Sequence, residues 1–161
     1  YELACHVLSR ARTRFVYVGD PHVYPSTHAR LNGVRKALFL KGMSLADENV
    51  LPGTEEGYKA IVEKVRTDKI DAVICNSDHD AALMMRKCLE AGFEIPGQVA
   101  IAGFDDQPIA KLLNVPLTTV AQPAQGLAIR VISTLRDRIE NPDLPPTTVR
   151  IQGELIIRES T

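Results

Sequence analysis

The sequence contains no tryptophan, only three cysteines, and no apolar run long enough to form a membrane-spanning helix. Cys5, Cys75 and Cys88 are odd in number and lack C-x-x-C spacing, so neither a disulfide framework nor a zinc site is expected. The first residues, from Tyr1 to Ala4, also lack the basic and apolar regions of a signal peptide. These absences favour a protein of the reducing cytoplasm that does not contact a membrane.

An excess of either charge is also absent, because 19 Lys and Arg residues stand against 20 Asp and Glu residues and leave a net charge of −1. A nucleic-acid surface requires clustered Lys and Arg to neutralise phosphates. Any DNA contact made by the protein is therefore expected outside this chain.

The motifs of common enzyme classes are missing as well. The chain has no HxH, HExxH or GxSxG pattern and no glycine-rich phosphate loop. His22, His28 and His79 stand alone, and single histidines on loops and helix starts are mostly solvated. We therefore expect no catalytic residue, no metal site and no cofactor.

A receiver-like signalling domain is disfavoured too, because it needs an acidic pair after its first strand and Asp20 here is followed by proline.

What the sequence does contain is an alternation of short apolar runs with longer amphipathic ones, which predicts an α/β fold with a parallel sheet flanked by helices. A length of 161 residues suits one such unit, and no linker or repeat marks an internal boundary. Thr54 is expected to cap one helix and Gly42 to end another. Strands are expected at 15–19, 49–51, 72–75, 99–102, 117–121, 147–151 and 154–157, and helices at 2–10, 27–41, 54–67, 78–91, 109–113 and 126–140.

Two adjacent carboxylates, Asp105 and Asp106, follow the apolar run 99–102, with Gly103 allowing a sharp turn between them and the strand. Ligands of open α/β sheets usually bind beyond the carboxyl ends of the strands, where a carboxylate can accept hydrogen bonds from hydroxyl or N–H groups. The alternative is structural, because an Asp pair after glycine also forms Asx turns and helix caps. Asp78 poses the same choice, since it follows strand 72–75 and either caps the next helix or faces the cleft.

Three segments taken in order resemble the effector domain of the lactose-repressor (LacI/GalR) family: GFDD at 103–106, PLTTVAQP at 116–123 and ELIIRES at 154–160. Members of this family are bacterial transcription repressors whose effector domain is similar to type I periplasmic sugar-binding proteins. The resemblance implies a Rossmann-like lobe of a periplasmic-binding-protein-like fold. The whole chain, 1–161, is then a single partial domain, the C-terminal lobe, with residues 122–152 crossing back toward an N-terminal lobe that lies outside the chain. The helix-turn-helix of full members is likewise outside it.

The resemblance also implies a set of ligand-binding residues. The family pattern Arg-x-x-Gly matches Arg30 to Gly33, and an arginine fork can bind a hydroxyl pair, a carboxylate or a base edge, although spacing alone favours an exposed helix arginine. Ser77 occupies a position where many members have an asparagine that reaches the ligand. Gln122 belongs to the crossing segment and reaches the cleft as a hinge or ligand residue. The implied ligand-binding set is Asp105, Arg30, Ser77, Asp78 and Gln122.

The implied function is that of an effector sensor in a repressor. A sugar, sugar acid, polyol or purine bound between the lobes shifts the population of conformations that fit operator DNA. The protein is expected to form a homodimer, with residues 50–65 and 70–89 as candidate surfaces, and to bind operator DNA through a helix-turn-helix that is not in this chain. The alternative is a periplasmic sugar-binding protein of a transport system, which uses the same lobe.

Overall fold

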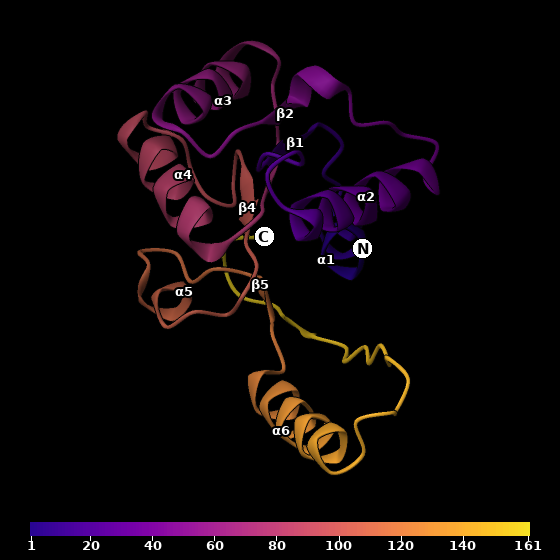
Figure 1. Cartoon of the computed structure of the whole chain (residues 1–161). Coiled ribbons are helices and arrows are strands. Elements are labelled where there is room, and N and C mark those ends of the chain that lie inside the picture. Colours follow the sequence, from indigo (N-terminus) through magenta and orange to yellow (C-terminus); the bar gives the residue numbers. More distant parts are fainter.

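The computed structural model describes residues 1–161, and at its centre lies a four-stranded parallel sheet with the strand order β2-β1-β3-β4 (Figure 1). β1, β3 and β4 are buried along their whole length. Such burial on both faces is the reason that these strands are continuous apolar runs rather than alternating ones. The strand bounds are Phe15–Val18 for β1, Val50–Leu51 for β2, Ala72–Cys75 for β3 and Ala100–Ala102 for β4.

Helices cover both faces of the sheet and divide the core into two clusters. One cluster contains Val16 and Val73 and packs against α3 (Glu55–Thr67), α4 (Asp78–Glu90) and the short α5 (Ile109–Leu112). The other contains Tyr17 and Ile74 and packs against α1 (Glu2–Ser9) and α2 (Pro25–Phe39). Neighbouring strand residues therefore point to opposite clusters, as the two-residue period of a strand requires. Each large apolar side chain buried here stabilises the fold by about 1.5–3 kcal/mol.

Local sequence signals set the helix ends. The Thr54 hydroxyl accepts a hydrogen bond from the Gly57 N–H at 3.2 Å and caps α3, as predicted. Pro25 occupies the first turn of α2, where its fixed φ fits the helix and its missing N–H costs nothing, so this helix begins two residues before the predicted start. After α2, Gly42 adopts a φ of +71°, a conformation that favours glycine and turns the chain away from the helix axis.

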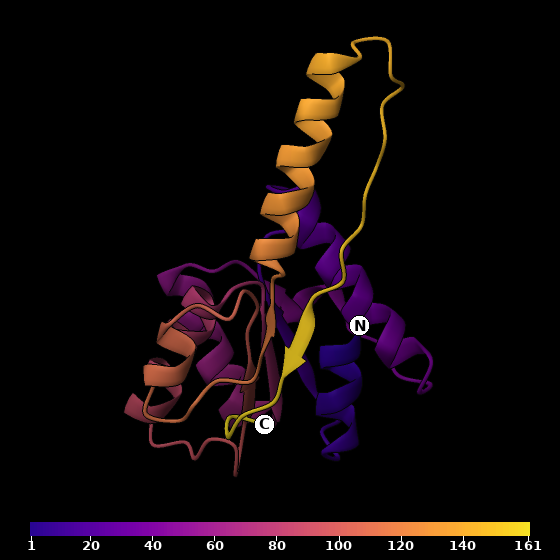
Figure 2. The ribbon, with the colours of Figure 1, turned by 90° about the horizontal axis from the view of Figure 1, so that it is seen from below.

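Two segments connect this body to a long projecting arm. β5 (Thr119–Ala121) leads outward and β6 (Glu154–Ile156) returns beside it as an antiparallel pair. Between them α6 (Ala124–Glu140) stands clear of the rest of the molecule, as Figure 2 shows. No residue of α6 is buried. The helix of the arm therefore contributes no buried residue to the core.

The predicted α/β fold and its parallel sheet are confirmed, and most predicted elements agree with the observed ones within one or two residues. The predicted strand at 147–151 is wrong. That segment is largely exposed and no other strand lies within hydrogen-bonding reach of its backbone, so its β-favouring residues have no ladder to join. None of the helices combines the length and the apolar character that crossing a membrane requires.

Candidate functional site

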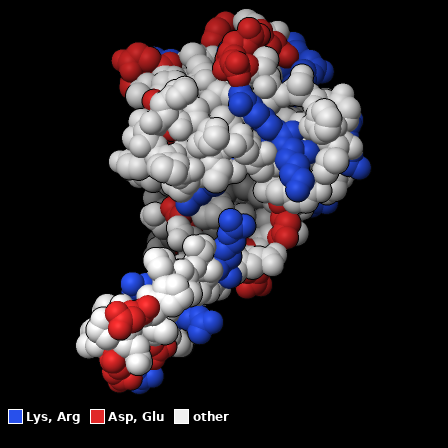
Figure 3. Space-filling view, turned by 45° about the vertical axis from the view of Figure 1, so that its right-hand side comes forward, with Lys and Arg blue, Asp and Glu red and all other residues white.

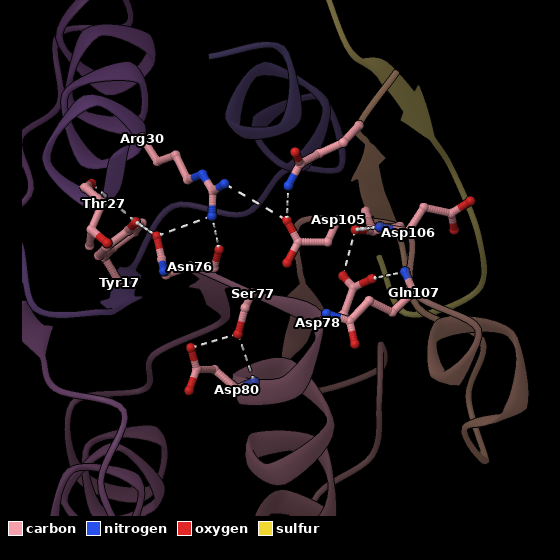
Figure 4. Close-up of polar contacts among 12 residues, drawn as sticks. Tyr17, Thr27, Arg30, Asn76, Ser77, Asp78, Asp80, Asp105, Asp106 and Gln107 are labelled. Carbon is pink, nitrogen blue, oxygen red and sulfur yellow. Dashed lines mark hydrogen bonds and ion pairs between the residues drawn. The ribbon is translucent and has the colours of Figure 1, made fainter. Parts of the chain in front are cut away.

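Polar side chains from four parts of the chain meet at the carboxyl edge of the sheet, which Figure 4 shows in close-up. Asn76 and Ser77 follow β3, Asp105 follows β4, Gln122 follows β5, and Arg30 extends from α2. These loops meet because parallel strands all end at the same edge, and β5 continues this arrangement through a parallel bridge between Thr118 and Ala102. The predicted cleft residues thus come from separate elements that the fold brings together.

Arg30, Asp105 and Gln122 form a connected trio. The Gln122 Nε2 donates a hydrogen bond to Asp105 Oδ1 at 2.5 Å, and the Arg30 Nη2 lies 3.8 Å from the same oxygen. The side chains of Arg30 and Asp105 are 24% and 20% exposed, so both remain open to a ligand from outside. The trio offers a guanidinium fork, a carboxylate and an amide within one small area, which suits a ligand carrying several hydroxyl groups.

The Arg30 guanidinium is held from two directions. Its Nη1 donates to the backbone oxygen of Asn76 at 2.6 Å, and its central carbon lies 3.8 Å from the centroid of the Phe104 ring. The Asn76 side chain is fixed in turn by the Tyr17 hydroxyl, which donates to its Oδ1 at 3.2 Å. A guanidinium on an aromatic face is attracted by the ring quadrupole and loses few rotamers on binding. Arg30 is therefore preorganised at the edge of the sheet.

Ser77 lies at the same edge, but its hydroxyl caps α4. It accepts a hydrogen bond from the Asp80 N–H at 3.1 Å and donates to the Asp80 carboxylate at 2.8 Å. The same carboxylate accepts a hydrogen bond from the Tyr58 hydroxyl at 2.8 Å. Burial is the main cause that raises the pKa of Tyr58 well above its usual range, and the hydrogen bond to Asp80 raises it further. The capping role that the sequence left open for Asp78 therefore belongs to Ser77.

Asp78, which the sequence places either at the helix cap or in the cleft, is fully buried in this structure. Its carboxylate accepts a hydrogen bond from the Thr119 hydroxyl at 2.5 Å and another from the Gln107 N–H at 2.8 Å. Burial raises the pKa of Asp78, and the carboxylates of Asp105 and Asp106 raise it further, while the two hydrogen bonds oppose the shift. β5 thus packs over Asp78, and the carboxylate supports the loop that carries Asp105.

The backbone of that loop is strained. Asp105 has a φ of +116° and Asp106 a φ of +50°, in the region that favours glycine. Each such residue costs about 1–3 kcal/mol and persists only where its surroundings fix it. The Asp105 N–H donates to the Val120 carbonyl at 2.9 Å, and the Asp106 carboxylate pairs with Arg158 at 2.5 Å. Backbone strain that is held in place beside a partly exposed carboxylate is characteristic of ligand sites.

A hollow of about 550 Å³ lies between α2 and β2, near the same edge, and none of the predicted site residues lines it. Arg30 instead lines a small hollow of about 50 Å³ together with Tyr17 and Phe104, and the Asp105 side chain beside it is partly exposed. Asp20, His22, His28 and Asp47 line the hollow, but the chain brings together no group of three or more metal-ligand side chains there or elsewhere.

The sequence reasoning missed three supporting residues: Asn76, Phe104 and Arg158. Asn76 and Phe104 hold Arg30, and Arg158 pairs with Asp106. Two of these residues lie in motifs that the sequence analysis uses. Phe104 lies within GFDD, and Arg158 is the single cation within ELIIRES. A lone cation that follows an apolar run and becomes buried requires an anionic partner.

The family model described as a periplasmic binding protein-like domain matches residues 4–161. The transcriptional regulator CelR of Thermobifida fusca is 28% identical over 158 residues, which cover 96% of this chain and 46% of the relative. The regulator GalR of Escherichia coli K12 is 28% identical over 159 residues, which cover 96% of this chain and 46% of that relative. This chain thus spans about half the length of the curated relatives that it matches.

Solved structures agree with these sequence matches. A complex of the transcriptional regulator CelR with cellobiose has a TM-score of 0.88 and 26% identity, covering 98% of this chain and 50% of that one. A sugar-binding regulator of the LacI family from Escherichia coli, complexed with phosphate, has a TM-score of 0.85 and 25% identity. The match covers 99% of this chain and 59% of that one. The curated relatives are transcriptional regulators.

Proposed function

The chain belongs to the periplasmic binding protein-like domain family and, within it, to the LacI/GalR group of helix-turn-helix regulators, and from this membership we propose that it senses the effector of a bacterial transcriptional repressor. The lobe binds a sugar or sugar-like molecule in a cleft between two lobes. The alternative, a periplasmic sugar-binding protein of a transport system, shares the fold, but the regulators among the relatives favour a repressor.

One observation carries the proposal: Arg30, Asp105 and Gln122 converge at the carboxyl edge of the sheet while staying open to solvent. A sugar, sugar acid or polyol presents adjacent hydroxyl groups that donate to the Asp105 carboxylate and accept from the Arg30 fork. A purine presents a base edge with the same mixture of donors and acceptors. Ser77 lies beside this trio, and Asp78 supports it from below.

The α6 arm supports a second lobe as the other wall of the cleft. Five apolar side chains of this helix, Ile129, Val131, Ile132, Leu135 and Ile139, are 58–71% exposed. In Figure 3 the arm extends to the lower left, with its charged side chains gathered mainly toward its tip. Apolar surface of this extent on one helix marks a contact face. Residues 122–152 therefore cross back to an N-terminal lobe, and 1–161 forms the C-terminal lobe.

Effector binding between the lobes selects one of two lobe arrangements, and that choice reaches operator DNA through a helix-turn-helix outside this chain. A homodimer matches the two half-sites of a palindromic operator. An apolar groove of about 470 Å³ between α4 and α5, lined by Leu83, Leu89 and Ile109 among others, supports residues 70–89 as part of the dimer surface. Such a protein acts in the cytoplasm, where its DNA is, and its three cysteines are free thiols.

Thermal unfolding of the full-length protein tests the proposal against cellobiose, galactose, gluconate, sorbitol and hypoxanthine, which represent the ligand classes. A ligand at 100 times its Kd stabilises the native state by about 2.7 kcal/mol, and the melting temperature rises accordingly. We expect one class to raise the melting temperature of the native protein and to leave that of Asp105→Ala unchanged. A shift of equal size in the variant would place the ligand elsewhere, and no shift from any class would contradict a small-molecule effector of these kinds.

A further inference from the structure

Arg158 and Asp106 form an ion pair that joins the returning segment to the loop of the cleft, although they are 52 residues apart. The Arg158 Nη2 lies 2.5 Å from Asp106 Oδ1, and its Nη1 donates to the Leu117 carbonyl at 2.7 Å. The two side chains are only 12% and 19% exposed. This is the most buried of the ion pairs in the chain, and the guanidinium fork spans two separate segments.

The ion pair fixes the residue next to the cleft carboxylate. Asp106 directly follows Asp105, and both have positive φ angles. Two further contacts come from β5, since the Asp105 N–H donates to the Val120 carbonyl and the Asp106 N–H to the Thr119 hydroxyl at 3.4 Å. The second of these is long, so the ion pair is the stronger restraint on Asp106. Without it, the backbone can relax toward ordinary φ values and carry the Asp105 carboxylate out of the trio.

We infer that Arg158 is a positioning residue of the effector site, which through Asp106 holds the strained loop in the conformation that aims Asp105 into the cleft. This inference rests on the proposed function in that Asp105 contacts the effector. Arg158 itself does not touch the ligand. Because it lies just beyond β6, it also makes the loop geometry depend on the segment that returns from the α6 arm.

Stability alone does not distinguish positioning from simple structural support, because removing either partner leaves a poorly solvated charge and destabilises the fold. Removing both charges at once does distinguish them. In the double variant Asp106→Asn with Arg158→Met no unpaired charge remains, so most of the lost stability returns. The restraint on the loop does not return, so positioning stays impaired.

Amide hydrogen exchange on the full-length protein without any ligand tests the restraint directly. We expect the amides of Asp105 and Asp106 to exchange at least tenfold faster in Arg158→Met, in Asp106→Asn and in the double variant, and less so in Arg158→Lys, while β1 is unaffected. Lys87→Met is the control, because it removes an ion pair of similar length but greater exposure, Lys87 to Glu55 at 2.6 Å, away from the cleft. Unchanged exchange at Asp105 in the double variant would overturn the inference.

Binding of cellobiose, or of whichever panel compound stabilises the native protein, provides the second measurement. We expect the double variant to bind at least tenfold more weakly even though its melting temperature is close to the native value, and Arg158→Lys to recover part of the affinity. Native affinity in a double variant with a loosened loop would overturn the inference. If no compound binds the native protein, the proposed function fails, whereas the exchange measurement still decides whether Arg158 holds the loop.

Discussion

Gln122 and Asp105 lie 17 residues apart in the chain, yet the Gln122 amide donates directly to the Asp105 carboxylate at 2.5 Å. Asp105 follows β4 of the parallel sheet, and Gln122 follows β5 and opens the segment that leads to α6. A ligand that displaces the amide from the carboxylate therefore acts at once on the lobe and on the crossing segment. In the proposed function, this contact is the route by which effector binding acts on the arrangement of the two lobes.

Asp105→Ala is expected to abolish the effector response without unfolding the domain. The carboxylate is 20% exposed and its side-chain partners are Gln122 and Arg30, so its loss removes these two contacts and the proposed ligand hydrogen bonds but no apolar packing. Asp105→Gly should remove the same contacts while relieving the strain at φ +116°, and we expect its free energy of unfolding to exceed that of the alanine variant by about 1 kcal/mol. Calorimetric titration with the ligand and denaturant unfolding measure the two effects. Unfolding of both variants under native conditions would show that Asp105 is structural.

Phe104→Leu is expected to weaken effector binding by about 0.5–2 kcal/mol, because Arg30 loses the aromatic face that lies 3.8 Å from its guanidinium. Phe104→Tyr keeps the face and serves as the matched control, with near-native affinity. The Kd of each variant should be measured at low and high salt. Equal affinities in the leucine and tyrosine variants would contradict a cation–π role for this ring.

The free energy of unfolding should depend on pH through Asp78. Burial raises the pKa of this carboxyl above its ordinary value of 3.8, so the folded state binds the proton more tightly than the unfolded state. The contribution of Asp78 to stability is therefore greatest below about pH 3.8 and declines as the pH rises through the raised pKa. Asp78→Asn cannot titrate, so the stability of the native protein relative to this variant should fall across that window. A difference that stays constant with pH would exclude the raised pKa.

Leu135→Asp on α6 is expected to destabilise the full-length protein by about 2–5 kcal/mol, as for a core position, although the side chain is 58% exposed in this lobe. The reason is that the apolar face of α6 packs against the proposed N-terminal lobe. Ser133→Asp, on the other face of the same helix, is the control and should change the stability by less than about 1 kcal/mol. Equal effects of the two substitutions, measured by denaturant unfolding, would argue against that packing.

The sequence was sufficient for the fold because its signals are local. Apolar runs bounded by glycine, proline and capping residues define each strand and helix, and the alternation of the two leaves little choice but a parallel sheet. The segment 147–151 shows the limit of this approach. Its residues favour a strand, but a strand exists only where a neighbour accepts its hydrogen bonds, and none lies beside it.

The sequence by itself also determined where ligand groups gather, because residues that follow parallel strands must meet at one edge, and Asp105 follows such a strand. Only the tertiary structure decided which of them face outward. Asp78 is buried because Thr119, 41 residues away in the chain, packs over it. The Asp106 carboxylate is already paired with a cation, because Arg158 from the far end of the chain lies beside it. Burial and ion pairing depend on contacts between distant segments, and no local pattern encodes which segment will cover which side chain.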